Sequence, residues 1–478
     1  MAEYPYRDLV ETNGSRGPEE AEYGIEDTGV LENGQYWDVE TTVAKASPSD
    51  LCWKLSLTNN SDSEQTIHVL PSVWLRNSWA WGDDHFESDW DKPSIKLDGD
   101  RLVVDHCDIG RFHFYVDRYN ELPTKWLFTE NDSNLNGLFG QENKSPFCKD
   151  AFHEHIIGGR EDAVNPSGEG TKAAAWLQLT VPAGTTKEVR CRLVASEDDH
   201  GQRFEDFEEI ISTRRAEEAS FYEHMLPQGL SEEERRVAVQ GYAGLLWSKQ
   251  FYYYIVKYWL FGDNGEGNAT ASRLVGRNKD WRHLFARDVL SMPDKWEYPW
   301  FACWDSAFHM VAFARLDPDF AKKQLLLFLR EWYLHPNGQI PAYEWSFSDV
   351  NPPVHAWAVW QVYQVLERNG VEDLDWLERA VQKLSLNFTW WVNRKDHDGN
   401  HLFSGGFLGL DNIGVFDRSQ DLGDGARLLQ ADGTAWMGGF CSQMLEMCLK
   451  LAETRPAYED MASKFFEHFV RIARAMNE

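Results

Sequence analysis

The 478-residue chain carries a net charge of −30 at pH 7. A surface of this charge repels phosphate backbones and anionic lipid, which argues against a nucleic-acid-binding protein. The sequence has no uninterrupted apolar run of about 18 residues, the length needed to span a membrane, and no apolar signal core follows Met1.

The cysteine and tryptophan contents indicate the cellular compartment and the kind of ligand that we expect. Seven cysteines are scattered without a CxxC or other metal-ligand spacing. We therefore expect no metal site and no cofactor, and buried thiols in a reducing compartment, the cytoplasm. The 22 tryptophans suit a surface that is apolar and can also donate hydrogen bonds, and sugar rings present such a partner. The alternative is a large tryptophan-rich core.

The first 200 residues or so have the pattern of a β domain. Six β-rich segments are separated by turn residues such as Asp98-Gly99; they span 51–58, 65–77, 94–105, 112–117, 173–181 and 187–195. Many strands without interleaved helices predict an antiparallel β-sandwich over residues 1–203. A connecting helix is predicted over 204–226, within a linker at 204–230.

From Ser231 the apolar period changes to that of α-helices, and a capping box, SEEE, begins there. Seven helices are predicted, at 231–260, 304–315, 317–334, 353–369, 373–395, 434–453 and 457–477. Asn369-Gly370 and Pro456 mark helix ends. Three long loops, 262–303, 335–352 and 396–433, are rich in tryptophan and glycine, and loops of this length are typical of a functional site.

Both ends of the sequence suggest a piece of a longer protein. The last predicted helix carries an apolar face, and seven helices in consecutive hairpins form an open arc whose final face has no partner. The first residues show no recognisable beginning of a sandwich. We therefore expect an N-terminally truncated β domain and an incomplete helical domain over 231–478; the alternative is a complete, irregular helical domain.

The segment WEYPWFACWDSAFH (296–309) sets Asp305 among six aromatic rings. Because apolar surroundings raise the pKa of a carboxyl, Asp305 can keep a proton near neutral pH and deliver it to a leaving oxygen. The alternative is a structural helix cap, since a loop turns into a helix here. His309, four residues later, is expected to fill the core, whereas Trp300 and Trp304 are expected to wall a sugar.

Two further loops also bring polar groups and tryptophan to the start of a helix. The first loop combines Glu344 and Trp345 within many hydrogen-bonding residues. The second places Asp411-Asn412 next to glycines, which let a ligand approach the backbone closely, and leads into a helix with Trp436. We expect the acids and the amide to bind sugar hydroxyls and the tryptophans to stack on the ring.

The motifs WEYPWFACWDSAFH, GQIPAYEWSFSDVNPPVHAW and LQADGTAWM occur in this order. With them the sequence resembles glycoside hydrolase family 63, and it is most similar to bacterial members described as α-glucosidases or as mannosyl-oligosaccharide glucosidase-like. The likeness runs through essentially the whole chain, including the early segments DLVETN and LPSVWLRNSWAWGDD. The chain looks like a fragment that lacks both ends of the family's full length.

The resemblance implies a β-sandwich followed by an (α/α)6 barrel, here incomplete at its C terminus. It implies hydrolysis of α-linked glucosides or related oligosaccharides with inversion. The aspartate of the family's WDxxFH motif is its general acid and corresponds to Asp305, and Asp411 and Asn412 match a sugar-binding pair. The family's general base is a later glutamate beyond this sequence, so we expect the fragment to be inactive or impaired.

Two alternatives stay open. The chain could be a non-catalytic glycan-binding protein that keeps the pocket and lacks the base, or another (α/α)6 enzyme such as a trehalase-, glucoamylase- or phosphorylase-like one. Within the sequence only Glu297 and Glu344 are candidates for a substitute base. In each alternative the partner is an oligosaccharide or small α-glycoside, with no nucleic acid and no membrane.

Overall fold

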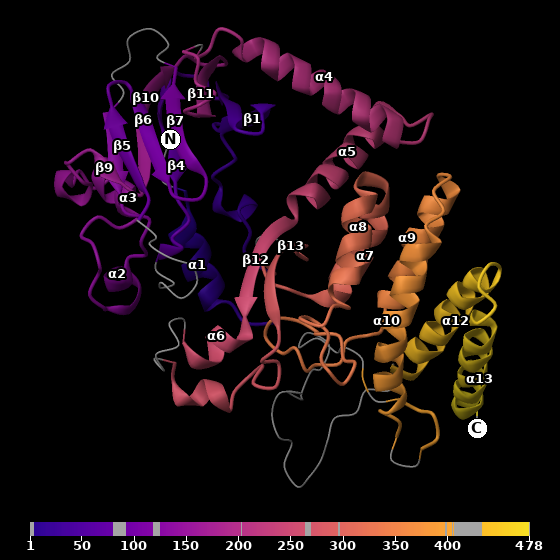
Figure 1. Cartoon of the computed structure of the whole chain (residues 1–478). Helices are drawn as coiled ribbons and strands as arrows, with labels where there is room; N and C mark the ends of the chain where they lie inside the picture. The colour runs from indigo at the N-terminus through magenta and orange to yellow at the C-terminus, as the bar shows by residue number, and fades with distance from the viewer. Residues whose placement is uncertain are drawn as a thin grey trace. The chain divides into compact units, whose positions relative to one another are not determined.

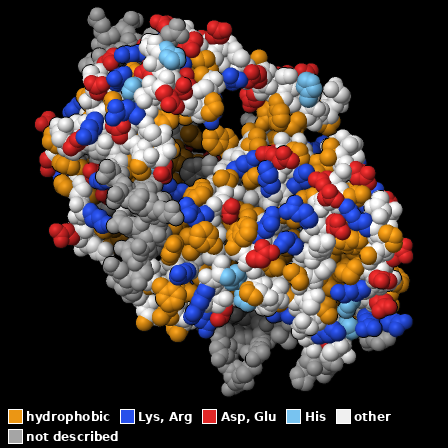
Figure 2. All heavy atoms as spheres, viewed as in Figure 1, with side chains coloured by type: hydrophobic (Ala, Val, Ile, Leu, Met, Phe, Trp, Pro, Cys, Tyr) orange, Lys and Arg blue, Asp and Glu red, His pale blue; other side chains and the backbone are white. Residues whose placement is uncertain are grey.

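The computed structural model describes residues 4–79, 92–117, 125–201, 203–262, 269–294, 297–396, 399–403, 405 and 433–477. The chain divides into two compact units, Met1–Phe221 and Tyr222–Glu478, and the boundary falls inside the long helix α4 (Phe207–Met225). On the face shown in Figure 2, acidic and basic side chains are interspersed over the surface.

Two antiparallel sheets form the first unit (Figure 1). The larger sheet has the strand order β1-β2-β11-β7-β6-β5-β9, and in the smaller sheet β10 pairs with β3, β4 and β8. The strands are β1 (Trp37–Ser47), β2 (Asp50–Asn59), β3 (Gln65–Val69), β4 (Ser72–Trp74), β5 (Ser94–Asp98), β6 (Arg101–His106), β7 (Gly110–Val116), β8 (Lys125–Thr129), β9 (Glu169–Gly170), β10 (Lys172–Val181) and β11 (Thr186–Ala195).

One hydrophobic cluster joins residues of both sheets, including Phe114 of the larger sheet and Phe128 of the smaller one. A second, small cluster packs Phe207 and Ile211 at the start of α4 against Cys52 of β2. The short helices α1 (Tyr6–Ser15), α2 (Leu135–Phe139) and α3 (Ala151–Ile156) lie outside the sheets. The predicted antiparallel β-structure is confirmed, and β1, β8 and the short β9 add strands that the sequence pattern did not indicate.

The second unit begins with a helix, a strand and another short helix, where the sequence predicted a single helix over 231–260. The helix α5 (Glu232–Trp247) is followed by β12 (Lys249–Ile255) and α6 (Val256–Phe261). β12 pairs with β13 (Phe285–Ser291), which lies in the segment predicted as a loop. The prediction was wrong because KQFYYYI combines aromatic and β-branched residues that favour a strand, and its partner is distant in sequence.

The remaining helices match the predicted ones, with α8 shorter than expected. They are α7 (Cys303–Leu316), α8 (Pro318–Leu327), α9 (His355–Arg368), α10 (Leu374–Val392), α12 (Gly433–Ala452) and α13 (Tyr458–Asn477). They lie side by side in Figure 1: α7 contacts α8 and α9, and α12 contacts α10 and α13. Their facing sides form one large hydrophobic cluster. Their arrangement as part of an (α/α)6 barrel stays a proposal.

Local signals explain where several helices start. Ser231 and Glu234 form the predicted capping box at α5. The side chains of Asp317 and Asp373 accept hydrogen bonds from backbone N–H groups in the first turns of α8 and α10. Among the described residues, no helix combines the length and the hydropathy that a membrane crossing requires.

Candidate active site

Asp305 lies in the first turn of α7, which begins at Cys303 with Ala302 as its N-cap. Asp305 is therefore not the N-cap residue, and it takes the first-turn position that the structural alternative also allowed. Burial raises the pKa of the Asp305 carboxyl, opposed by a hydrogen bond from its own backbone N–H. Within the described part of the chain it forms no ion pair with a cation. A raised pKa of this kind favours the protonated form of the carboxyl in the folded protein.

Backbone pairing joins the segment before Asp305 to the loop that carries Glu344. Ala302 and Tyr343 form an antiparallel bridge. The Cys303 N–H donates to the Ala342 carbonyl over 2.9 Å, and the Glu344 N–H donates to the Phe301 carbonyl over 3.0 Å. Two of the three predicted site loops are thus brought together, and main-chain atoms fix their register.

Asn278 holds the same loop from the other side. It is 7% exposed and has a positive φ of 60°, a conformation that asparagine tolerates better than most residues. Its Nδ2 donates to the Glu344 carbonyl over 2.7 Å, and its Oδ1 accepts from the Phe347 N–H over 2.9 Å. The sequence analysis did not single out Asn278, because its partners are more than 60 residues away in sequence.

The Glu344 carboxyl lies in a half-buried setting between polar neighbours. Burial raises the pKa of this carboxyl, while the Tyr252 hydroxyl and the Arg277 guanidinium act in the opposite direction. Arg277 lies between two indoles, 4.8 Å from the ring centroid of Trp259 and 4.3 Å from that of Trp345. Glu344 therefore has a polar, cation-containing side, in contrast to Asp305.

Of the four predicted tryptophans, two contact each other and two lie apart from that pair. The Trp300 and Trp345 rings meet edge-to-face with centroids 5.9 Å apart, and Trp345 is 47% exposed. Trp304 lies next to Asp305 in sequence and lines a separate small cavity. Trp436 is partly exposed in the first turn of α12, and no ring contact connects it to the other three tryptophans among the described residues. Two of the four tryptophans therefore contact each other.

The small cavity, of about 40 Å³, is lined by Trp304, by the loop residues 340–342 and 349–354, and by side chains of α10 such as Trp391. Its volume holds about one water. Asn351 lines it: its Nδ2 donates to the Ala342 carbonyl over 3.3 Å, and its buried Oδ1 has no partner within the described ranges. A buried acceptor of this kind suits a hydroxyl donor from a ligand or a water.

Asp411 and Asn412 lie outside the described residues. The described flanks of their segment meet beside the small cavity, because the Gly433 N–H donates to the Gly405 carbonyl over 2.8 Å. A Cβ atom on Gly405 would lie 2.5 Å from Val350, which lines that cavity. His309 accepts or donates through Nδ1 to Ser291 at 2.7 Å, in line with the expected packing role.

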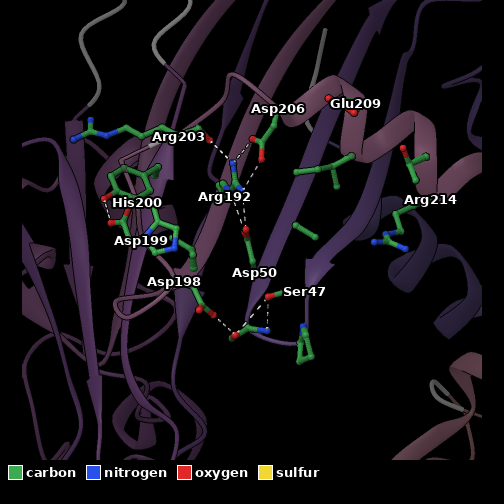
Figure 3. A pocket seen from close by; sticks show the side chains of 17 residues that line it. Ser47, Asp50, Arg192, Asp198, Asp199, His200, Arg203, Asp206, Glu209 and Arg214 are labelled. Carbon is green, nitrogen blue, oxygen red and sulfur yellow. Dashed lines mark hydrogen bonds and ion pairs between the residues drawn. The ribbon is translucent and has the colours of Figure 1, made fainter.

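A polar cavity of about 740 Å³ lies in the first unit (Figure 3). Arg192 extends between two acids there, with Nη2 2.6 Å from Asp50 and Nη1 2.6 Å from Asp206. Ser49 donates to Asp198 over 2.6 Å in the same cavity. Because these charged groups bind one another, their geometry is that of a structural network, and we assign the candidate active site to the second unit.

Comparison with known proteins supports this assignment. Residues 298–422 match the model of the mannosylglycerate hydrolase MGH1-like glycoside hydrolase domain. The match contains Asp305, Glu344 and the Asp411-Asn412 pair. The match supports a glycoside hydrolase-like family and a carbohydrate-active enzyme. That the chain belongs to family 63, and that it is a fragment, are proposals.

The chain is also 44% identical to the uncharacterized protein YMR196W of Saccharomyces cerevisiae over 518 residues, which cover 99% of this chain and 47% of that protein. The chain thus spans about half the length of this curated relative. Two structures of the GH92 α-mannosidase BT3965 from Bacteroides thetaiotaomicron align at lower similarity. One, in complex with mannoimidazole, has a TM-score of 0.31 at 9% identity and covers 92% of this chain and 50% of that one. The other has a TM-score of 0.32 at 11% identity, with 87% and 58% covered. These TM-scores are too low to carry an argument.

Proposed function

We propose that the chain is the acid-bearing part of an inverting α-glycosidase, related to glycoside hydrolase family 63, that acts on α-linked glucosides or related oligosaccharides. The observation that carries the proposal is the Asp305 carboxyl, half-buried at the start of α7 with a raised pKa and no ion-pair partner among the described residues. The helices α7 to α13 are proposed to belong to an (α/α)6 barrel.

In the proposed reaction Asp305 gives its proton to the glycosidic oxygen as the bond to the anomeric carbon breaks. A water on the opposite face attacks that carbon and loses a proton to the base, which leaves the product with inverted configuration. Trp300, Trp304, Trp345 and Trp436 are proposed to stack on or wall the sugar, while Glu344, Asp411 and Asn412 bind its hydroxyls. Asp305 is regenerated by a proton from solvent.

The resemblance to family 63 places the general base in a later segment than this sequence contains. Within the chain, Glu344 is the better candidate for a substitute because it lies on the loop paired with the Asp305 segment, whereas Glu297 is exposed. Inverting enzymes separate acid and base by about 6.5–9.5 Å.

A finer substrate assignment has one specific support. The name of the matching family model includes mannosylglycerate hydrolase, whose substrate carries a carboxylate on its leaving group. Arg277, stacked on Trp345 beside Glu344, would pair with such a carboxylate. We therefore propose a glycoside with an anionic leaving group as the second candidate substrate.

The test compares two substrates that differ in their need for an acid. The 478-residue chain and the longer yeast relative are assayed with an α-linked disaccharide and with α-glucosyl fluoride, whose leaving group needs no protonation. Asp305→Asn should lower kcat/KM for the disaccharide about 10²–10⁴-fold and change fluoride hydrolysis far less, while proton NMR of the product shows the β-anomer first.

Asp319→Asn removes an exposed acid in the first turn of α8; it is the control and should leave the hydrolysis of both substrates unchanged. Equal loss on both substrates in Asp305→Asn, full retention of disaccharide hydrolysis, or an α-anomeric first product would overturn the proposed role. Binding of saccharides without turnover in either protein would favour the non-catalytic alternative.

The proposed compartment is the cytoplasm. All seven cysteines are free, and six of them are buried. Free thiols in this number are typical of a reducing environment.

A further inference from the structure

A short hairpin, residues 395–403, and helix α13 bring a second group of polar side chains together. The hairpin is closed by a bridge between Lys395 and Phe403. His401 projects from it at a positive φ of 61°, and its ring centroid lies 6.2 Å from that of His468 on α13. These two imidazoles play no part in the proposed hydrolysis.

Both imidazoles have a ring nitrogen in need of a partner. The Nδ1 atoms of His401 and His468 are buried and make no hydrogen bond within the described part of the chain. The other contact of His468 is apolar, an edge-to-face packing on Phe388 with centroids 5.2 Å apart. A buried polar atom without a partner costs about 1–3 kcal/mol, so two of them side by side indicate a bound water or ligand.

Three cations lie around these rings. Lys395, Lys464 and Arg471 all lower the pKa of His468, after the larger effect of burial, and Lys395 and Arg471 do the same for His401. In the described ranges these three cations form no ion pair. Lys450 on α12, by contrast, contacts Glu367, Glu372 and Glu453. In a chain of net charge −30, three neighbouring cations without such acidic partners among the described residues stand out.

Space for a ligand lies beside His468, on the α13 side of these groups. One face of α13 lines a cavity of about 250 Å³ that includes Lys464, His468 and Arg471. Figure 2 shows Lys, Arg and His side chains together at its lower right, where Figure 1 places α13. Asp460 and Glu467 also line the cavity. The nearby acid Asp396 is already occupied, since it accepts hydrogen bonds from Asn400.

We propose that His401 and His468, with Lys395, Lys464 and Arg471, form a binding site for a phosphate group. A phosphate oxygen would accept hydrogen bonds from the two Nδ1–H groups, and its charge would neutralise the three cations. Binding would favour protonation of both imidazoles, because it replaces mutual repulsion by attraction. The phosphate group belongs either to the free inorganic ion or to a phosphorylated sugar.

The first test measures binding of inorganic phosphate to the full chain at constant ionic strength, with chloride as the reference salt. Calorimetry should show saturable binding, and the melting temperature should rise with phosphate concentration by mass action. In wild-type protein, NMR titration should shift the imidazole resonances of two histidines. The same titration with a hexose monophosphate identifies the source: tighter binding assigns a sugar phosphate, and equal affinity assigns the free ion.

Variants then locate the site. His468→Gln and Arg471→Gln should each weaken phosphate binding about tenfold or more, the loss expected for one charge-assisted hydrogen bond. Arg474→Gln, on the same helix and equally exposed to solvent, is the matched control and should bind as wild type. The proposal is overturned if phosphate binds no better than chloride, if no histidine resonance shifts, or if Arg471→Gln and Arg474→Gln lose affinity equally.

Discussion

The Asn278 side chain donates a hydrogen bond to the Glu344 main-chain oxygen over 2.7 Å. The same amide accepts from the Phe347 N–H, so one buried side chain closes the turn that carries Glu344 and Trp345. The position of the candidate site therefore depends on a residue in a different loop, about 65 residues earlier.

Asn278→Asp tests this dependence. The substitution keeps the acceptor for Phe347 but replaces the donor to the Glu344 carbonyl with a second oxygen, so a buried acceptor faces a buried acceptor. We expect the free energy of unfolding to fall by about 1–3 kcal/mol, and the affinity for a glycoside to fall. Urea denaturation and calorimetric titration with a glycoside measure the two effects. Asn369→Asp, at an exposed helix end, is the control and should show neither effect. An Asn278→Asp protein that unfolds and interacts with the glycoside as wild type does would contradict the positioning role of Asn278.

Asp305→Asn should stabilise the protein at high pH while it removes the acid. The raised pKa means that folding favours the protonated carboxyl, so the contribution to stability is fully present below the ordinary aspartate pKa and is lost as pH rises through the raised value. An asparagine stays neutral and avoids this loss. The melting temperature of the variant should exceed that of wild type at pH 8 and match it at pH 4. A lower melting temperature at pH 8 would show that Asp305 is stabilised as an anion.

The buried Arg192 network should depend more on Asp50 than on Asp206. The Asp50 side chain is 10% exposed and the Asp206 side chain is 39% exposed, and both lie 2.6 Å from the guanidinium. Loss of a charge is costlier where solvent cannot replace it. We expect Asp50→Asn to lower the free energy of unfolding by about 3 kcal/mol and Asp206→Asn by about 1 kcal/mol. Denaturation of both variants in the same buffer measures the order, and the reverse order would contradict this explanation.

His355 should make stability fall in mild acid. Burial lowers its pKa to about 4, although its ring bonds the Leu325 carbonyl over 2.7 Å. The unfolded state therefore binds the proton first, and stability is lost as pH falls from about 6.5 towards 4, by about 3 kcal/mol in total. His355→Gln does not titrate, so the difference in unfolding free energy between the variant and wild type should change across this window. A constant difference would show that the histidine is protonated in the fold.

Local signals in the sequence predicted most of the helices. A capping serine at 231, capping aspartates at 317 and 373 and a Gly370 with φ of 81° define ends that depend on neighbours within four residues. The pairing of β12 with β13 was missed because it joins residues that are 30 to 42 positions apart. Such contacts leave only a weak trace in a single sequence.

The candidate site was predictable only where it depends on neighbouring residues in the sequence. The aromatic setting of Asp305 indicated a raised pKa, and burial at the start of α7 raises the pKa of this carboxyl. The pairing of Ala302 with Tyr343 and the role of Asn278 depend on the fold, and nothing in the local pattern of NKDWRH around Asn278 indicates its partners. Asp411 and Asn412 lie outside the described residues, so their place in the site stays a prediction.

The bridge between Ala302 and Tyr343 uses only main-chain atoms. Any side chain compatible with that backbone can occupy the neighbouring positions without changing how the two loops are aligned. We therefore expect that substitutions in the loop from Tyr343 to Ser346 change the preference for one sugar over another, while the proposed proton donor Asp305 keeps its position. Libraries that randomise these positions should yield many folded proteins with altered selectivity.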